Sequence, residues 1–231
     1  MRKTTGRYTF WGILIVLALF LLNAGSANAS DFGLFRKGFL PEDSYTLVWT
    51  ADDRTGDIVN DPKEGIATYN EKGLWISNAR KNHSWMYGFE IPKKNIARTL
   101  TETALEVRDI TGFAQPGIIV GNKAVFYSFR IDGRKSMGSF SVAHSNNNAI
   151  LITKFDIPKV TYPCFIGLRH NAKTKELEAF VNNVPVKKIT LPYYGMPDIA
   201  SVNKICIETL NPFRHTSAGG VLYGNLYLAT Q

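Results

Sequence analysis

Paired carboxylates are the first chemistry to look for, because two acids about 5–5.5 Å apart perform retaining glycoside hydrolysis. The nearest approach is Glu176-Leu177-Glu178, where both acids fall on one face of a strand but no third acid follows. Glu106 and Asp109 fall on opposite faces of their strand. We interpret Glu176 and Glu178 as solvent-facing residues, and predict no local catalytic pair at either place.

The other residue types that carry chemistry are scattered. His83, His144, His170 and His215 are not spaced as a local metal-ligand pair, and no nucleophile elbow or phosphate loop occurs. Oxygen-bearing side chains crowd residues 52–61 and have the ligand type that calcium prefers, but they fit no EF-hand register. Turn formation is the simpler interpretation of that segment. We expect no catalytic residue, no metal site and no cofactor.

Aromatic and arginine side chains are better candidates for a ligand site. Five of them alternate with the aliphatic residues of their own strand, so their side chains are expected on the other face of that strand. They are Trp75, Arg108, Phe126, Arg130 and Arg169. An aromatic ring flanked by guanidinium and hydroxyl groups suits a sugar or a carboxylate. We expect all five on one sheet face or at its rim, and expect Arg130→Ala to weaken binding with little effect on stability. The alternative is a second buried face with packed arginine stems.

Short runs of alternating apolar and polar residues must position these side chains. Such runs end at turn residues and cover segments 45–49, 85–91, 105–108, 125–131, 164–169, 177–181 and 205–208. Asp132-Gly133-Arg134 and Asn171-Ala172-Lys173-Thr174 have the composition of hairpin turns. About a dozen strands at 8–12-residue spacing predict an all-β sandwich or barrel.

One pair of runs also resembles a known family. Phe165-Ile166-Gly167-Leu168-Arg169 is followed by residues 177–181 and then by Asn182-Asn183. This resembles consecutive strands of laminin-G-like and other concanavalin A-like jelly rolls, with Asn183 where those turns usually have glycine. Residues 220–228 are similar to the closing strand of such domains. The resemblance implies an antiparallel β-sandwich of the concanavalin A-like jelly-roll type, and says little about function.

The N-terminus predicts export. Arg2, Lys3 and Arg7 precede an apolar or small stretch over residues 10–22, and Ala27-Asn28-Ala29 offers small residues for signal peptidase. The stretch is shorter than the roughly 20 residues of a membrane span. We therefore expect residues 1–29 to be a cleaved signal peptide, with no stable span afterwards. Residues 30–231 are then one β-sandwich domain in the periplasm or outside the cell.

The two cysteines fall on opposite phases of their strands. Cys164 is in phase with Ile166, which places it inward, whereas Cys206 is out of phase with Ile205 and Ile207, which places it outward. A disulfide needs converging side chains. We therefore expect two free thiols slightly more than a bridge, although the expected compartment is oxidising.

A non-catalytic binding module is the favoured function, with a glycan or another extracytoplasmic molecule as ligand. The net charge of +8 comes from 27 basic and 19 acidic residues, and we interpret it as an aid to solubility, with no nucleic-acid partner. A glycoside hydrolase or polysaccharide lyase with dispersed acids is one alternative, and an envelope scaffold that contacts only proteins is another. The sequence leaves the oligomeric state open.

Overall fold

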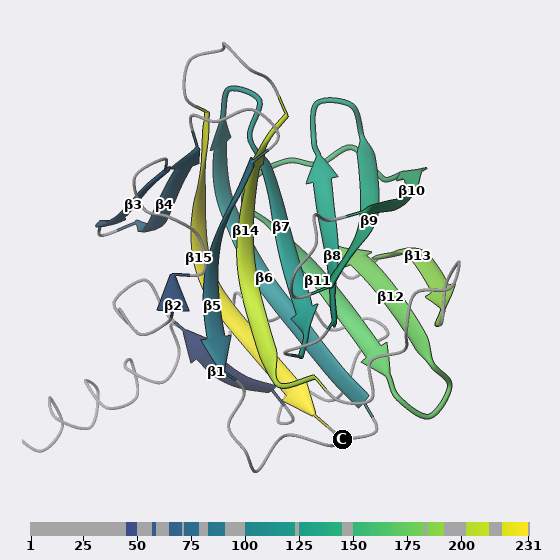
Figure 1. The fold of residues 1–231 in the computed structure, drawn as a ribbon. Helices are drawn as coiled ribbons and strands as arrows, with labels where there is room; N and C mark the ends of the chain where they lie inside the picture. Colours follow the sequence, from purple (N-terminus) through teal and green to yellow (C-terminus); the bar gives the residue numbers. More distant parts are fainter. Residues whose placement is uncertain are drawn as a thin grey trace, which may run out of the picture.

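A computed structural model shows two antiparallel sheets facing each other (Figure 1). The structure describes residues 45–49, 57–58, 65–70, 72–78, 83–90, 100–122, 125–144, 150–182, 184–191, 202–212 and 219–230. Within these ranges it contains no helix, and its strands are β1 (Tyr45–Trp49), β2 (Asp57–Ile58), β3 (Gly65–Asn70), β4 (Gly73–Asn78), β5 (His83–Glu90), β6 (Leu100–Thr111), β7 (Gln115–Gly121), β8 (Val125–Asp132), β9 (Met137–His144), β10 (Ile150–Asp156), β11 (Cys164–Asn171), β12 (Glu176–Val181), β13 (Val184–Thr190), β14 (Lys204–Asn211) and β15 (Gly220–Thr230).

Strands that are distant in the sequence are neighbours in both sheets. The eight-stranded sheet has the order β13-β12-β11-β6-β15-β4-β3, and β1 also pairs with β15. The seven-stranded sheet has the order β10-β9-β8-β7-β14-β5-β2. The predicted antiparallel β-sandwich is thereby confirmed.

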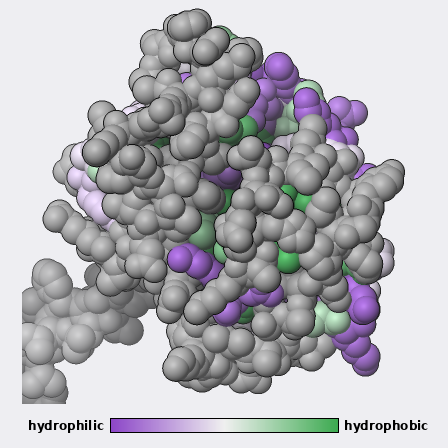
Figure 2. All heavy atoms as spheres, viewed as in Figure 1, coloured by the Kyte–Doolittle hydropathy of each residue, from purple (hydrophilic) through white to green (hydrophobic). Residues whose placement is uncertain are grey.

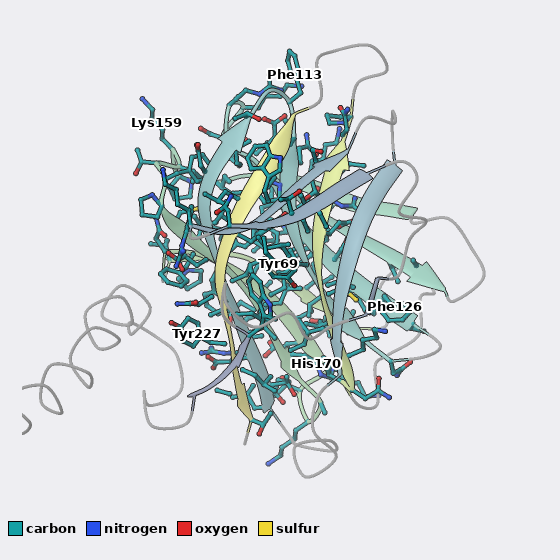
Figure 3. The ribbon with its side chains drawn as sticks, turned by 90° about the vertical axis from the view of Figure 1, so that its left-hand side faces the viewer. Tyr69, Phe113, Phe126, Lys159, His170 and Tyr227 are labelled. Atoms are coloured by element: carbon teal, nitrogen blue, oxygen red, sulfur yellow. The ribbon has the colours of Figure 1, made fainter. Side chains whose placement is uncertain are left out.

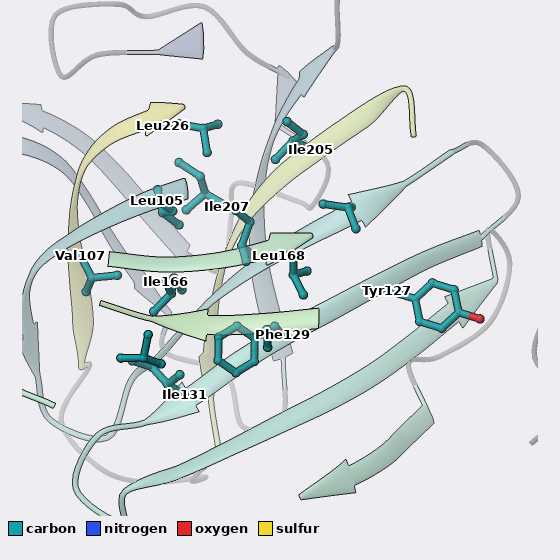
Figure 4. Packing of buried hydrophobic residues seen from close by; sticks show 14 of the residues in the cluster. Leu105, Val107, Tyr127, Phe129, Ile131, Ile166, Leu168, Ile205, Ile207 and Leu226 are labelled. Atoms are coloured by element: carbon teal, nitrogen blue, oxygen red, sulfur yellow. The ribbon is translucent and has the colours of Figure 1, made fainter. Parts of the chain in front are cut away.

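Alternation decides which side chains fill the space between the sheets. From the seven-stranded sheet, β8 contributes Tyr127, Phe129 and Ile131, and from the eight-stranded sheet, β11 contributes Ile166 and Leu168. All five are at most 1% exposed, and Figure 4 shows them within one apolar layer. Burying one such side chain is worth about 1.5–3 kcal/mol, so the inward phase of each strand is strongly fixed.

One polar side chain crosses this apolar layer. Tyr223 of β15 is fully buried, and its hydroxyl donates a hydrogen bond to the backbone carbonyl of Glu208 in β14. The same hydroxyl pairs with the Thr209 hydroxyl at 3.0 Å. Burial raises the pKa of Tyr223, so the hydroxyl keeps its proton. Tyr223 therefore joins the two sheets by hydrogen bonds within an apolar surround.

The hairpin turns expected after β8 and β11 are present. After β11, the Asn171 side chain accepts hydrogen bonds from the backbone N–H groups of Lys173 and Thr174, both at 3.0 Å. After β12, Asn182 adopts a left-handed conformation with φ of 47°. Its side chain accepts a hydrogen bond from the Phe165 N–H at 2.8 Å, which ties this turn to the start of β11.

Some expectations fall outside the described residues. The predicted signal peptide of residues 1–29 lies there, as do the side chains of residues 52–61 that suggested calcium. In the part of the chain that the structure describes, no helix is long and apolar enough to cross a membrane.

Candidate functional site

The five predicted site residues lie on the outer faces of two different sheets. Phe126 and Arg130 belong to β8 of the seven-stranded sheet, whereas Trp75, Arg108 and Arg169 belong to β4, β6 and β11 of the eight-stranded sheet. The expectation of one shared face is therefore wrong. Alternation separates inward from outward side chains within a strand, but it does not say which sheet the strand joins.

Figure 3 shows the two outer faces through one labelled residue of each. Phe126 of the seven-stranded sheet and Tyr227 of the eight-stranded sheet lie on opposite sides of the sandwich.

Arg130 forms a two-pronged ion pair with Glu208 of β14. Arg130 Nε lies 2.6 Å from Glu208 Oε2, and one terminal nitrogen lies 2.8 Å from Oε1. The two residues are separated by β7, whose Gly117 pairs with both of them. A Cβ at Gly117 would lie 2.9 Å from Arg130 Cγ and 3.0 Å from Glu208 Oε2, so the absent side chain is what lets the pair meet.

The pair is almost buried although it lies on an outer face. The exposed fractions are 11% for the Arg130 side chain and 2% for the Glu208 side chain. Burial acts to lower the pKa of Arg130, but the charge and hydrogen bonds of Glu208 outweigh it and raise that pKa above its ordinary value. The guanidinium therefore stays charged and bound to its carboxylate.

Serine hydroxyls surround the pair on the strands beside it. The second terminal nitrogen of Arg130 donates to Ser141 Oγ at 3.1 Å. Ser128 pairs with Ser141 in register, and Ser139 pairs with Arg130. We call this group the Arg130 surface, and it consists of Phe126, Ser128, Arg130, Ser139, Ser141 and Glu208.

Phe126 forms the apolar end of the Arg130 surface. It pairs with Gly121 of β7, and a Cβ at Gly121 would lie 2.8 Å from Phe126 Cδ1. The ring therefore packs on the glycine of the neighbouring strand. Phe126 is partly exposed and stands outside the buried core. The prediction that it points away from the core is confirmed.

Two carboxylates on this face, Glu208 and Asp132, are already engaged. Both oxygens of Glu208 accept hydrogen bonds from Arg130. Asp132 accepts one from the Gln115 side chain at 3.1 Å and lies 3.8 Å from Arg134. Asp132 ends β8. Figure 2 shows that the coloured part of the surface carries hydrophilic residues at its upper right and lower right. Among the side chains that the structure describes, no group of three His, Cys, Asp or Glu could hold a metal ion.

On the eight-stranded sheet, Arg169 belongs to a row of alternating charges. Its Nε lies 2.7 Å from Glu102 of β6, and a terminal nitrogen lies 3.4 Å from Glu178 of β12. Lys188 of β13 continues the row, 3.9 Å from Glu178 and 3.5 Å from Glu176. We call this row the Arg169 ladder. It becomes more exposed toward the sheet edge, from 0% for the Glu102 side chain to 48% for Lys188.

Arg108 is also paired, within its own strand. It binds both oxygens of Glu106 at 2.9 Å and donates to the backbone carbonyl of Lys72 at 2.6 Å. The pair lies over Gly224 of β15, where a Cβ would overlap the Glu106 carboxylate. The three arginines thus share one feature, a carboxylate partner on an outer sheet face.

Sequence reasoning missed these carboxylates. Glu106 and Glu208 do carry a signal, because each stands on the outward phase of its strand like the arginines. Local spacing of acids does not reveal this pair, because Arg130 and Glu208 are 78 residues apart in the sequence. A comparison of outward charges across all strands would have marked Glu208 as a candidate partner.

Both cysteines are buried thiols that form no disulfide with each other. Cys164 belongs to the core between the sheets, and Cys206 pairs in register with Ile119 on the outer phase of the seven-stranded sheet. The predicted opposite phases are confirmed. Burial, with a smaller contribution from the charge of Glu106, raises the pKa of Cys164 to about 12.

Comparison with known proteins supports the fold. No protein-family description and no curated protein sequence matches the chain. Among solved structures it is similar to the Crh5 transglycosylase in complex with NAG, at 7% identity and a TM-score of 0.54, covering 81% of this chain and 84% of that one.

Two further structures have the same architecture. A Bacillus subtilis protein of unknown function with a galectin-like fold has 9% identity and a TM-score of 0.53, covering 80% of this chain and 93% of that one. The Emp47p carbohydrate recognition domain has 7% identity and a TM-score of 0.51, covering 83% and 96%. The chain therefore has the antiparallel β-sandwich fold of these structures, one of which is described as galectin-like.

Proposed function

We propose that the protein is an exported, non-catalytic module that binds a glycan through the Arg130 surface. The observation that carries the proposal is the ion pair of Arg130 and Glu208, almost buried on an outer sheet face. Moving two charges out of water costs several kcal/mol per ion, and an apolar pair of similar volume is often as stable. A ligand explains the presence of this pair better than stability does.

Arg130 keeps donors that a sugar hydroxyl can use. A guanidinium has five N–H donors, and Glu208 and Ser141 take three of those of Arg130. The Arg130 side chain is 11% exposed and can offer its remaining donors to a sugar hydroxyl, whereas the Glu208 carboxylate, 2% exposed, holds the guanidinium in place. Because the pair is already locked, a ligand does not have to order it.

Phe126 adds an apolar contact at a distance that favours an oligosaccharide. It lies four residues before Arg130 on the same face of β8, which is about 13 Å along a strand. Aromatic rings stack on the apolar faces of ligand rings. A ligand that touches both residues is therefore longer than one sugar ring.

The similar structures and the N-terminal sequence support this ligand class and location. Two of the similar structures are a transglycosylase solved with NAG and a carbohydrate recognition domain. The predicted signal peptide supports a periplasmic or secreted location, where glycans are available.

Hydrolysis has less support at this surface. General acid–base catalysis requires a carboxyl group that can exchange a proton with the reacting bond. Both oxygens of Glu208 are held by the Arg130 guanidinium, and Asp132 is held by Gln115. Neither carboxylate is therefore placed to act as a free acid or base.

A glycan array with the purified protein, followed by calorimetric titration of the best ligand, tests the proposal. We expect Phe126→Ala to weaken binding by about 1–3 kcal/mol, the usual effect of truncating a stacked ring. Phe113→Ala is the matched control, because Phe113 is a partly exposed ring at the β6–β7 turn, away from the Arg130 surface (Figure 3).

Three results would contradict the proposal. Glycan binding that survives Phe126→Ala unchanged removes the Arg130 surface from recognition. If Phe126→Ala lowers the free energy of unfolding by about 3–5 kcal/mol, as truncation of a core phenylalanine does, the ring is a packing residue. Failure of the native protein to bind any glycan would favour the scaffold alternative.

A further inference from the structure

A second aromatic side chain lies flat on the opposite sheet. Trp75 occupies the outer face of β4, between Leu74 and Ile76, which are both 0% exposed. A Cβ at Gly220 of β15 would lie 2.3 Å from Trp75 Cζ2, 2.6 Å from Cε2 and 2.9 Å from Cη2. Similar distances to three consecutive ring atoms mean that the ring covers Gly220 with its face and not with its edge.

The indole is partly exposed and stands outside the buried core. A tryptophan that only filled space would be expected among the inward residues of its strand, where burial of its large apolar surface contributes most. Here one face of the ring packs on a glycine backbone, which leaves the opposite face as the side turned away from the sheet. Such a face is a stacking surface for a flat, largely apolar ligand ring.

Polar groups stand on both sides of this ring. In register, Trp75 pairs with Thr68 of β3 and Leu222 of β15, and Leu222 pairs with Asp109 of β6. Thr111 pairs with Gly220 under the ring, and its hydroxyl accepts a hydrogen bond from the Gly220 N–H at 3.2 Å.

The flanking polar groups are available to a ligand. Thr68, Asp109 and Thr111 are all exposed. Neighbouring strands are about 4.8 Å apart, so Asp109 and Thr111 lie about one strand beyond the strand that the ring covers. Hydroxyls and a carboxylate at that distance can bind the hydroxyls of a sugar whose ring stacks on the indole.

We propose that Trp75, Gly220, Leu222, Asp109 and Thr111 form a second glycan site, the Trp75 platform, which takes a neutral sugar ring. The Asp109 carboxylate accepts hydrogen bonds from hydroxyls and repels an acidic sugar. The platform lies on the eight-stranded sheet and the Arg130 surface on the seven-stranded sheet, so both sites can be filled at once. One molecule can then join two glycan chains. The choice of a glycan as ligand rests on the proposed function, whereas the position of the site rests on the geometry of Trp75 and Gly220.

Native mass spectrometry with soluble tetrasaccharides tests the platform. The probes are tetramers of N-acetylglucosamine and of β-linked glucose, with a galacturonic acid tetramer as the acidic comparison. We expect the native protein to bind two neutral tetramers, Trp75→Ala and Phe126→Ala to bind one each, and the double variant to bind none. Affinity at the platform should fall about tenfold or more with Trp75→Ala, and Phe113→Ala should keep both sites.

A second variant tests the position of the ring instead of its presence. Gly220→Ala inserts a methyl group where the ring now lies, so the indole must leave the strand. We expect it to lose the same tetramer as Trp75→Ala, while Trp75→Ala keeps the unfolding midpoint of the native protein because the side chain is outside the core.

The outcomes separate the two sites. If Trp75→Ala lowers the number of bound tetramers and Phe126→Ala does not, the Trp75 platform is supported and the Arg130 surface is contradicted. If only Phe126→Ala lowers that number, the Arg130 surface is supported and the Trp75 platform is contradicted. Equal numbers for the native protein and Trp75→Ala overturn the platform. Preference for the acidic tetramer at the platform, or no binding of any tetramer, also overturns it.

Discussion

Arg130 on the seven-stranded sheet and Arg169 on the eight-stranded sheet are both outward arginines that face carboxylates, but they are neutralised differently. Arg130 has one partner, Glu208, and the pair is 11% and 2% exposed. Arg169 is 22% exposed, shares its charge between Glu102 and Glu178, and leads into a ladder that reaches solvent.

The difference in exposure gives the two arginines different effects on stability. In the Arg130 pair, loss of one charge leaves the other buried and unpaired, which is costly. In the outer part of the Arg169 ladder, water replaces a lost partner, so each exposed pair is worth little. The first arrangement couples stability to one pair, and the second spreads it over a row.

The largest effect is expected at the Arg130 pair. Arg130→Met removes the only cation that contacts Glu208 in the described structure, and should lower the free energy of unfolding by about 3–5 kcal/mol. This replaces the small effect on stability that the sequence suggested. The double variant Arg130→Met with Glu208→Leu should recover most of the loss, because no charge stays buried. Urea unfolding of all four proteins measures the coupling, and a single-variant loss below about 1 kcal/mol would mean that water reaches Glu208.

An intermediate effect on stability is expected at high pH. It arises at Cys164, on the inner side of the eight-stranded sheet, and so adds a buried group to the comparison of the two outer faces. Burial and, to a smaller extent, the charge of Glu106 raise the pKa of Cys164 from 9.0 to about 12. The folded protein therefore holds this proton more tightly than the unfolded chain. The resulting stabilisation is fully present below pH 9 and is lost as the pH rises toward 12.

Unfolding measured between pH 9 and pH 12 checks this expectation. Burial also raises the pKa values of Tyr162 and Tyr223, so stability should fall over the upper part of this range in every variant. Cys164→Ala should reduce the slope that begins near pH 9. An unchanged slope in that variant would assign the loss to the tyrosines alone.

The smallest effect is expected at the outer end of the Arg169 ladder. Lys188 is 48% exposed and lies 3.5 Å from Glu176. Lys188→Ala should change the free energy of unfolding by less than about 1 kcal/mol, and by less still at high salt. A loss comparable with that of Arg130→Met would show that the ladder acts as one unit and would remove the contrast between the two faces.

The sequence was sufficient to predict the fold because alternation and turns are local signals. Tyr127, Phe129 and Ile131 point inward as their spacing indicates, and the turn at Asn171 forms where its composition suggests. The outward phase of Phe126 was equally readable.

The candidate site was only half predictable, because its geometry depends on contacts between distant strands. Arg130 was identified from its phase, but Glu208 comes close only because β8 and β14 both pair with β7. Gly117 carries no chemistry of its own, and its role appears only when the strands on both sides are in place. The division of the five residues between two sheets is likewise a property of the whole topology.

The hydroxyl of Tyr223 has a mechanical consequence if each outer face binds a glycan chain as proposed. Aliphatic contacts between two sheets resist separation, but they have no direction and allow sliding. The hydrogen bond from Tyr223 of the eight-stranded sheet to the Glu208 carbonyl has a direction, and it ends on the residue whose carboxylate forms the Arg130 pair. A pull that separates the two outer faces would load this hydrogen bond along its own direction, directly beneath the proposed Arg130 surface.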